Sequence, residues 1–370
     1  MSPIITLCLL LASITELSGH IALVFPDEAG VRQVGLLRLD DDHFTALQSS
    51  PVLGAPRWSP DGNRLAFPVE RSPGQGGIAV QDIDAAQQPG AYRELPHARP
   101  RNILPRWHPQ GNALAYQSSE RHGEDAQIRV YHLEEDTETV WADGQIGLMR
   151  PVWLPSLDLM LLLDPNQELA IPGVDAERFL AEAEAHGAII CIGHTEVGGQ
   201  LRTEIFVITV TQSLKVLPII QRQSQRYVEW AVESGRRGRY IAFESNDGGD
   251  REIFVLGRRG ILNVSNHRAA DWNPVWSPRQ DLLLFESFRS GRRGIYRVHP
   301  ETAHVQPIAA NAEADFWAPA WSPDGRHVAY VGNPDGAPSL YVSDTNGGAP
   351  LQSLAAPTPA YAPAWRPHGH

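Results

Sequence analysis

The sequence is poor in cysteine, in lysine and in long apolar runs. It has two cysteines, Cys8 and Cys191, and one lysine, Lys215. Cys8 lies in the apolar N-terminal segment, so a chain without that segment would keep one cysteine, which excludes an internal disulfide and predicts a buried thiol. The chain has 31 basic and 43 acidic residues, and its net charge is -12. This balance argues against a nucleic-acid binder, because such proteins present a basic face.

An apolar run of eleven residues covers Ile4 to Ile14, which is too short to span a bilayer. It has the length of the apolar part of a secretory signal, although no basic residue precedes Arg32. We therefore predict a signal peptide over residues 1–19, a periplasmic or secreted location in the bacterial envelope, and no integral membrane segment in the rest of the chain. An N-terminal strand or a retained anchor is the alternative.

Catalytic motifs are also missing from the sequence. It contains no Gly-x-Ser-x-Gly nucleophile elbow, no His-Glu-x-x-His zinc motif and no phosphate-binding loop. Acidic runs at Asp40 to Asp42 and at Glu134 to Asp136 lack the ligand spacing of a calcium loop and predict solvated turns. We therefore expect no enzyme activity, no cofactor and no metal site.

A five-residue motif dominates what is present. Trp58-Ser59-Pro60-Asp61-Gly62 recurs unchanged as Trp321 to Gly325, and each copy stands between a short proline-containing strand and an apolar run. Proline fixes φ at the second turn position, and glycine tolerates the positive φ that precedes the next strand. The motif predicts a hairpin with a buried Trp whose role is structural.

Weaker copies of the motif recur along the chain, at intervals of 49, 46, 77, 46, 45 and 44 residues from Trp58 onward. They begin at Trp107, Trp153, Trp230, Trp276 and Trp365. Units of about 45 residues cannot bury their faces alone and must stack on one another. We predict an all-β protein in which residues 20–370 form a single seven-bladed β-propeller, with six or eight blades as alternatives.

One interval is about thirty residues longer than the others. Within it, Leu159 to Leu163 predicts the second strand of its blade. Asp175 to His186 has apolar residues at helical spacing, with Asp175 as an N-cap and Gly187 as a stop. We predict a short helical insertion over residues 174–187. The alternative places Phe179 at a Trp position and adds an abbreviated eighth blade.

Both ends of the repeat region carry an incomplete unit. Ile21 to Phe25, Val34 to Leu39 and Phe44 to Leu47 predict three strands with no Trp motif before them. Ala362 to Trp365 predicts a first strand with no further strands after it. We expect the two ends to complete one blade together, because this pairing removes free sheet edges.

The repeats carry a family resemblance. The pattern Pro-x-Trp-Ser-Pro-Asp-Gly-x-x-(Ile/Val/Leu)-Ala-(Phe/Tyr), followed by Gly-x-x-x-Ile-(Phe/Tyr)-Val, resembles the propeller repeats of the TolB family over nearly all of the chain after Gly19. We expect the TolB N-terminal α/β domain to be absent, so the resemblance is to the propeller alone, which usually has six blades in that family. The family implies an extracytoplasmic bacterial propeller that binds proteins.

Aromatic residues gather at one predicted site. The residue four before each motif Trp starts the innermost strand, near one mouth of the central channel, and in the last three units it is aromatic. Such rings can grip an apolar peptide residue or stack on a sugar. The alternative is that they pack against one another and close the ring of blades. With their neighbours, the candidate site residues are Trp272, Trp317, Tyr361, Asp271, Asp315 and Phe316.

Arginines form a second candidate site in two turns of the unit led by Trp230, on the opposite face of the propeller. A positive field there could orient an acidic partner. A solvated face without a function is the alternative. The residues are Arg236, Arg237, Arg239, Arg258 and Arg259.

We therefore expect an extracytoplasmic scaffold that binds a protein partner, or a carbohydrate, at the mouth of the channel. One alternative is a carbohydrate-active lyase or hydrolase that uses Asp271, Asp315 and His267. Another is a structural subunit of an envelope complex.

Overall fold

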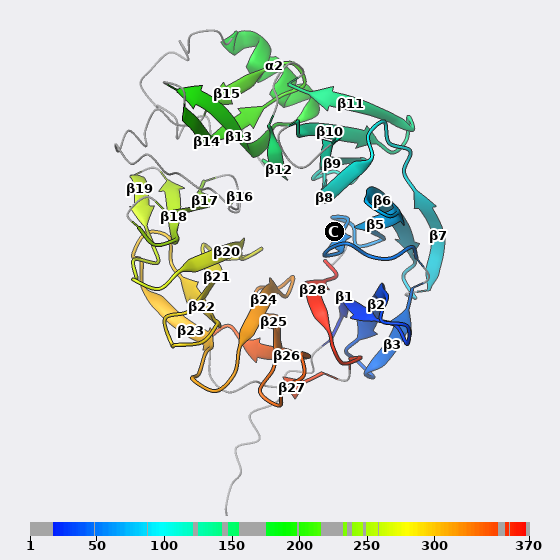
Figure 1. The fold of residues 1–370 in the computed structure, drawn as a ribbon, viewed down its shortest axis with the longest axis vertical. Coiled ribbons are helices and arrows are strands. Elements are labelled where there is room, and N and C mark those ends of the chain that lie inside the picture. The colour runs from blue at the N-terminus through cyan, green and yellow to red at the C-terminus, as the bar shows by residue number, and fades with distance from the viewer. Residues whose placement is uncertain are drawn as a thin grey trace, which may run out of the picture.

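The computed structural model describes residues 18–47, 49–86, 88–120, 125–142, 147–154, 175–197, 200–215, 232–234, 239–246, 249–257, 259–346, 352–354 and 356–367. Over these ranges the chain is nearly all strand, with one helix, and its sheets follow one another around a ring (Figure 1). The predicted all-β propeller class is confirmed. Residues 1–17, which hold most of the predicted signal peptide, lie outside the described ranges.

Five of the sheets have four strands each, and an eight-stranded sheet combines two further sets of four through one parallel bridge between Gly76 and Arg101. The first set consists of β28 (Tyr361–Trp365), β1 (His20–Pro26), β2 (Arg32–Arg38) and β3 (His43–Ala46). The second consists of β4 (Arg57–Trp58), β5 (Arg64–Ser72), β6 (Gln75–Ile83) and β7 (Pro89–Glu94). The third consists of β8 (Arg101–Trp107), β9 (Ala113–Ser119), β10 (Gln127–His132) and β11 (Thr137–Trp141).

The remaining four sets continue around the ring in chain order. They are β12 (Met149–Trp153), β13 (Ile189–Val197), β14 (Gln200–Ile208) and β15 (Ser213–Lys215); β16 (Val232–Ser234), β17 (Ile241–Ser245), β18 (Glu252–Gly257) and β19 (Gly260–Asn263); β20 (Asp271–Trp276), β21 (Leu283–Ser287), β22 (Gly294–Val298) and β23 (Val305–Ala309); and β24 (Phe316–Trp321), β25 (His327–Gly332), β26 (Ser339–Asp344) and β27 (Gln352–Ser353). The described strands thus form seven sets of four. The total number of blades stays a prediction, because residues 155–174 and 216–231 lie outside the described ranges.

The two ends of the repeat region meet in one sheet, as predicted. β28 pairs antiparallel with β1, with Ile21 opposite Trp365 and Ala22 opposite Ala364. In Figure 1 the red strand β28 lies beside the blue strand β1. The pairing supplies the first strand of the set that β1, β2 and β3 complete, so this set has the same four-stranded order as its neighbours.

Five of the motif Trp residues each donate a hydrogen bond to the inner strand of the preceding set. The indole N–H of Trp107 donates to the carbonyl of Arg57 at 2.9 Å, and that of Trp153 donates to the carbonyl of Arg106 at 3.0 Å. In each case the acceptor is the residue just before the Trp of the preceding set. The same bond recurs from Trp58 to Ala364, from Trp321 to Val275 and from Trp365 to Ala320. The structural role predicted for these Trp residues is confirmed at these five positions.

The two identical motif copies fold identically. In each copy, the serine hydroxyl donates to the motif aspartate, at 2.5 Å from Ser59 and at 2.6 Å from Ser322. The same hydroxyls accept backbone N–H groups five residues later, both at 2.9 Å. Gly62 has φ 72° and Gly325 has φ 71°, which is the positive φ that the turn was predicted to need. The sequence repeat therefore reports a repeated backbone conformation.

The inner strands contain a bulge that the sequence analysis did not predict. The residue three before the Trp has a positive φ in five inner strands, and the antiparallel register shifts at this point in all five. The five bulge residues all line the cavity at the centre of the ring. The residues are Leu104 (φ 57°), Arg150 (φ 56°), Asn273 (φ 56°), Ala318 (φ 53°) and Ala362 (φ 49°).

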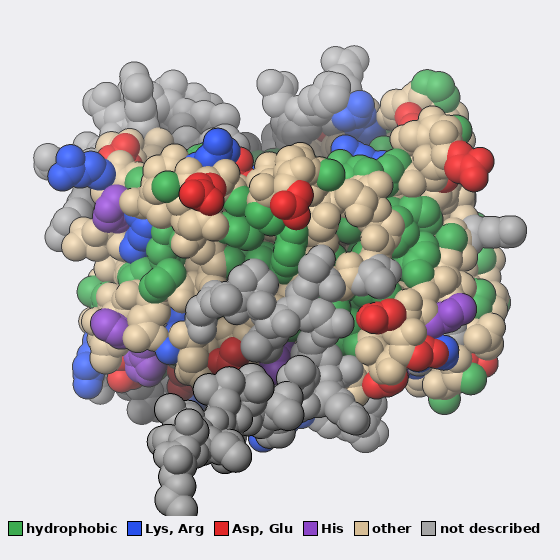
Figure 2. Space-filling view, turned by 90° about the horizontal axis from the view of Figure 1, so that it is seen from below, with side chains coloured by type: hydrophobic (Ala, Val, Ile, Leu, Met, Phe, Trp, Pro, Cys, Tyr) green, Lys and Arg blue, Asp and Glu red, His purple; other side chains and the backbone are tan. Residues whose placement is uncertain are grey.

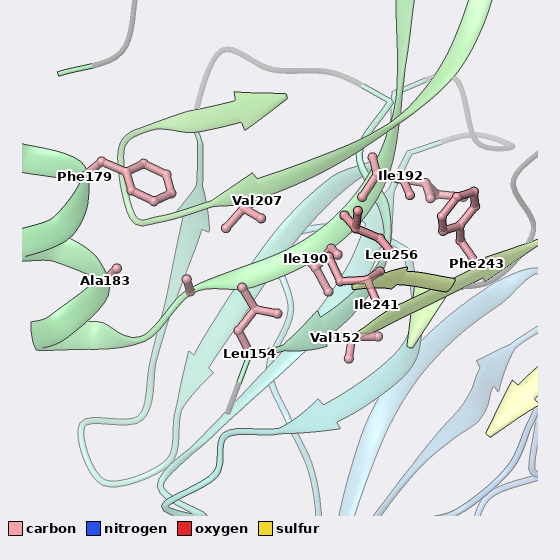
Figure 3. Close-up of a cluster of buried hydrophobic side chains, with 12 residues drawn as sticks. Val152, Leu154, Phe179, Ala183, Ile190, Ile192, Val207, Ile241, Phe243 and Leu256 are labelled. Carbon is pink, nitrogen blue, oxygen red and sulfur yellow. The ribbon is translucent and has the colours of Figure 1, made fainter. Parts of the chain in front are cut away.

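The predicted helical insertion is present as α2 (Ala176–His186), with Asp175 as its N-cap and Gly187 at its C-terminal end. A helix therefore occupies the stretch that the alternative interpretation assigned to an extra blade. Phe179 and Ala183 lie on the side of α2 that faces the sheet, and they join a cluster that continues into β17 and β18 (Figure 3). The helix is thus part of the core between two neighbouring sets.

The predicted strand order around this insertion was wrong. β12 pairs directly with β13, with Trp153 opposite Ile189, so β13 is the second strand of its set. The predicted second strand, Leu159 to Leu163, falls outside the described residues. The run after the helix is continuous and fully buried at Ile189 and Ile190, as a strand inside a sheet requires. Cys191 lies in the same buried stretch, and burial raises the pKa of its thiol.

Candidate functional site

The predicted aromatic residues lie where the inner strands begin. Trp272 follows the first residue of β20, and Trp317 follows the first residue of β24. Both side chains are half-buried. The guanidinium carbon of Arg293 lies 5.3 Å from the ring centroid of Trp272 and 5.8 Å from that of Trp317. One arginine thus links the two rings through cation–π contacts, in a Trp-Arg-Trp stack.

Glu286 in β21 holds Arg293 in this position. Its fully buried carboxylate pairs with Nε of Arg293 and accepts hydrogen bonds from Nδ2 of Asn273 at 2.7 Å and from the backbone N–H of Ala318 at 2.9 Å. A buried carboxylate needs such partners to offset its loss of hydration. Because Asn273 belongs to β20 and Ala318 to β24, Glu286 joins two inner strands and fixes the arginine between their Trp residues.

Phe288 extends the stack to the surface. Its side chain is 47% exposed, and its ring centroid lies 5.0 Å from that of Trp272. A hollow of about 430 Å³ opens beside these two rings. Asn246, Gly249, Arg251 and Ala270 complete the lining of the hollow. We call Trp272, Phe288, Arg293 and Trp317 together the aromatic mouth. It combines exposed aromatic surface with an anchored cation, which is the chemistry of binding hot spots.

Two of the other predicted aromatic residues lie elsewhere. Phe316 is 5% exposed and packs edge-on against Tyr330, so it belongs to the core beneath the mouth. Tyr361 packs against the apolar cluster between the set of β28 to β3 and the set of β4 to β7. The structure therefore brings together two of the three predicted rings, Trp272 and Trp317. Whether any of these residues binds a partner stays a prediction.

The predicted acidic residues are each held by an arginine. Asp271 is fully buried and accepts a hydrogen bond from Arg289 at 3.1 Å. Asp315 pairs with Arg292, also at 3.1 Å. The ring of His267 accepts the backbone N–H two residues later at 3.0 Å. Asp271 and Asp315 are therefore held by different arginines in the described structure.

Glu252 lies beside Asp271 and was missed by the sequence analysis. Its carboxyl group accepts the hydroxyl of Ser265 and the backbone N–H of His267, the latter at 3.0 Å. The pKa of Glu252 is raised to about 7. Burial is the largest cause and the neighbouring Asp271 adds to it, while the hydrogen bonds from Ser265 and His267 lower the pKa. This carboxyl group therefore changes its protonation state near neutral pH, next to the first residue of β20.

The second candidate site is only partly described. Arg236, Arg237 and Arg258 lie outside the described residues. Arg239 pairs with Asp281 of the neighbouring set at 3.0 Å, and Arg259 is exposed in the turn between β18 and β19. On the side of the ring seen in Figure 2, acidic, basic and hydrophobic side chains are mixed. The role of the arginine turns stays a prediction.

The glutamate that anchors the aromatic mouth had a signal in the sequence. The tripeptide Phe-Glu-Ser occurs at residues 243–245 and again at 285–287, at matching places in β17 and β21. In both copies the glutamate accepts the backbone N–H of a bulge residue in the next set, from Asn273 to Glu244 at 2.7 Å and from Ala318 to Glu286 at 2.9 Å. A glutamate in an otherwise apolar strand therefore marks the anchor of the site.

Comparisons with known proteins support the resemblance seen in the repeats. No protein-family model matches the chain. The Tol-Pal system protein TolB of Anaeromyxobacter dehalogenans is 31% identical over 135 residues, which are 36% of this chain and 28% of that protein. The chain therefore matches less than a third of the length of this curated relative.

Solved structures share the fold. TolB from Acinetobacter baumannii superposes with a TM-score of 0.53 at 15% identity, over 95% of this chain and 67% of that chain. The β-propeller domain of the Trilobed protease from Pyrococcus furiosus superposes with a TM-score of 0.61 at 12% identity, over 92% of this chain and 97% of that chain. At these identities the likeness shows the fold and leaves the function open.

Within the described ranges, no helix is long and apolar enough to cross a membrane. The sequence match to one TolB and the fold shared with another agree with the resemblance of the Trp repeats. The chain is a TolB-like β-propeller.

Proposed function

We propose that the chain is a protein-interaction scaffold of the bacterial envelope, in the periplasm or secreted, and that its partner docks on the aromatic mouth. The observation that carries the proposal is Phe288, which is 47% exposed beside the stack of Trp272, Arg293 and Trp317 and above the hollow of about 430 Å³. The similarity to a relative named as a Tol-Pal system protein supports both a location in the envelope and a protein partner.

The physical argument for docking rests on rigidity. Glu286 and its bonds from two inner strands fix Arg293, and Arg293 fixes both Trp rings, so little side-chain entropy is lost when a partner covers them. The exposed ring of Phe288 offers apolar area, and Arg293 offers a cation that can pair with a carboxylate or stack on an aromatic residue. A partner with an apolar residue next to an acidic one fits this surface.

The test is an affinity capture from the envelope fraction of the native bacterium. It compares the wild type, Phe288→Ala, the double variant Trp272→Ala with Trp317→Ala, and Ile103→Ala. Ile103 lies four residues before Trp107, so it holds in β8 the place that Trp272 holds in β20, and it is 36% exposed. It is therefore a matched control. Near-UV circular dichroism confirms that each variant is folded.

We expect one protein to be retained by the wild type and by Ile103→Ala and to be lost by Phe288→Ala and by the double variant. Retention of the same protein by all four chains would show that the mouth is structural. Capture of glycans with release of shortened oligosaccharides would contradict the scaffold hypothesis and favour a carbohydrate-active enzyme. A chain that captures nothing while it remains in a large envelope complex would be a structural subunit.

A further inference from the structure

Two buried carboxyl groups lie side by side next to the aromatic mouth. Asp271, the first residue of β20, is fully buried, and Glu252, the first residue of β18, is 9% exposed. The backbone N–H of Asp271 donates to the carbonyl of Arg251, the residue before Glu252, at 2.7 Å. The hydroxyl of Ser265 donates to Glu252. The carbonyl of Ser265 accepts Nη2 of Arg289 at 3.2 Å, and the same nitrogen donates to Asp271 at 3.1 Å. Backbone and side-chain contacts thus bring the two acids together.

This carboxyl pair is connected to the hollow of the aromatic mouth. Four of the six described residues that line the hollow stand directly next to Glu252, Asp271 or Arg289 in the chain. Two of these four, Phe288 and Ala270, are joined by a backbone hydrogen bond of 3.3 Å. A change in the distance between the two acids is therefore passed to the wall of the hollow. The four residues are Arg251, Ala270, Trp272 and Phe288.

One oxygen of the pair has no donor among the described residues. Arg289 donates to Oδ2 of Asp271, but the buried Oδ1 of Asp271 accepts no hydrogen bond in the described part of the chain. Such an atom costs free energy of folding and calls for an explanation. A proton on Glu252 supplies one, because the protonated carboxyl group can donate to Oδ1. The pKa of Glu252, which is about 7 with burial as the largest cause of the rise, agrees with a proton held up to neutral pH.

Other charged and titratable groups face the pair from the neighbouring elements. Arg289 comes from the connection between β21 and β22, and Glu244 of β17 lies 3.8 Å from Arg251. His267, between β19 and β20, donates its backbone N–H to Glu252 at 3.0 Å, and Nδ1 of its ring accepts the backbone N–H two residues later. The bond from Arg289 compensates one negative charge of the pair. Ionisation of Glu252 adds a second one at the same buried place.

We propose that Glu252 and Asp271 share one proton, and that its loss to water above neutral pH loosens the aromatic mouth and weakens the docking of the partner. Two ionised carboxylates in a buried site repel each other. The repulsion acts on Asp271, whose neighbours Ala270 and Trp272 line the hollow. The inference rests on the proposed docking of a protein at the mouth, and it makes that docking tighter in acid than in base.

The first experiment follows the mouth without any partner. The full chain is labelled with 5-fluorotryptophan, and the fluorine NMR signal of Trp272, assigned with Trp272→Phe, is recorded between pH 5 and 9. We expect one step near pH 7 in the wild type and none in Glu252→Gln, whose amide cannot ionise. Ser265→Ala should move the step to a higher pH, because the hydroxyl of Ser265 favours the ionised carboxylate.

His267→Gln and Glu313→Gln are the controls for this step. A histidine side chain ordinarily titrates in the same range of pH, and Glu313 is an exposed glutamate away from the pair. Both variants should keep the step of the wild type. A step that is lost in His267→Gln, or kept in Glu252→Gln, would overturn the proposal. If Glu252→Gln does not fold, the direction of the shift in Ser265→Ala decides the outcome.

The second experiment measures partner capture at pH 6 and at pH 8. For one shared proton, the wild type should hold the partner up to about tenfold more tightly at pH 6, and Glu252→Gln should hold it equally at both. Equal capture by the wild type at both values would support the docking and overturn its dependence on the proton. A step at Trp272 in a chain that captures nothing would support the shared proton and contradict the proposed function.

Discussion

Two glutamates on different sides of the ring each pair with an arginine, and they differ in their surroundings. Glu138 in β11 accepts hydrogen bonds from Tyr116 and His97 and pairs with Arg129. Glu286 in β21 pairs with Arg293. Around Glu138 the partners are enclosed: the side chain of His97 is fully buried, and its Nε2 accepts the backbone N–H of Ile78 at 3.0 Å.

Around Glu286 the network ends at the surface. The side chain of Arg293 is 33% exposed and lies between two half-buried Trp rings. The network of Glu138 therefore only holds the sets of β4 to β7 and β8 to β11 together. The network of Glu286 joins two inner strands and also presents a cation and aromatic rings to solvent. The comparison teaches that a buried carboxylate marks a candidate binding site when its arginine reaches the surface.

The largest expected effect is on stability at Glu138. Glu138→Gln leaves Arg129, whose side chain is 12% exposed, without its carboxylate, which should lower the free energy of unfolding by about 3–5 kcal/mol. Chemical unfolding at pH 7 measures this loss, with the exposed Glu134→Gln as the control, expected within about 0.5 kcal/mol of the wild type. The same stability for both variants would show that the enclosed network contributes nothing.

The stability from Glu138 should also depend on pH in acid. Burial raises its pKa, but the bonds from His97, Tyr116 and Arg129 hold the pKa of Glu138 at about 2, below its usual value of 4.5. The contribution is therefore complete above pH 4.5 and is lost as the pH falls toward 2. Wild-type and Glu138→Gln chains should converge in stability over this range.

A smaller loss of stability is expected at Glu286, together with loss of partner binding. Glu286→Gln removes the charge that holds Arg293, which should cost about 1.5–3 kcal/mol by chemical unfolding. The released arginine no longer fixes the Trp rings, so partner capture should fall as in Phe288→Ala. Arg293→Lys separates the two effects, because lysine keeps the charge but loses the planar stacking. Undiminished capture by both variants would break the comparison with Glu138.

The smallest expected effect is the pH dependence at Glu252. The pKa of Glu252 is about 7 in the folded chain, above the usual 4.5. Between pH 4.5 and 7, Glu252 is therefore protonated in the folded chain and ionised in the unfolded chain. The stability from the protonated carboxyl group is complete below pH 4.5 and is lost as the pH rises through 7. Thermal midpoints between pH 5 and 8 should fall in the wild type and in the exposed control Glu313→Gln, and less in Glu252→Gln. Parallel curves for all three chains would contradict this assignment.

The repeat pattern predicted the fold well because each unit must bury the same surface. Turn chemistry at Trp58 to Gly62 and at Trp321 to Gly325 is local, so the predicted positive φ of both glycines is confirmed. The helix at residues 176–186 followed from its N-cap and its spacing. The strand order around that helix did not follow, because the pairing of β12 with β13 joins residues on either side of a helical insertion that the repeat period does not include.

The candidate site could be predicted only in part. The positions of Trp272 and Trp317 followed from the motif period, because their distance from the Trp fixes their place on the strand. Arg293 comes from the connection between β21 and β22, and Phe288 from the same connection, which the period does not constrain. Tyr361 has the same spacing as the two Trp residues but packs against another cluster, because its neighbours belong to the closing set.

The sequence by itself determined the all-β repeat, the hairpin turns, the buried Trp residues and the meeting of the two ends, because period, turn residues and apolar runs act over a few positions. The tertiary structure decided which charges are brought together. Arg293 stands between two Trp rings, because strands of different sets meet around the channel. Contacts between residues far apart in the chain depend on the closed ring, which no single repeat contains.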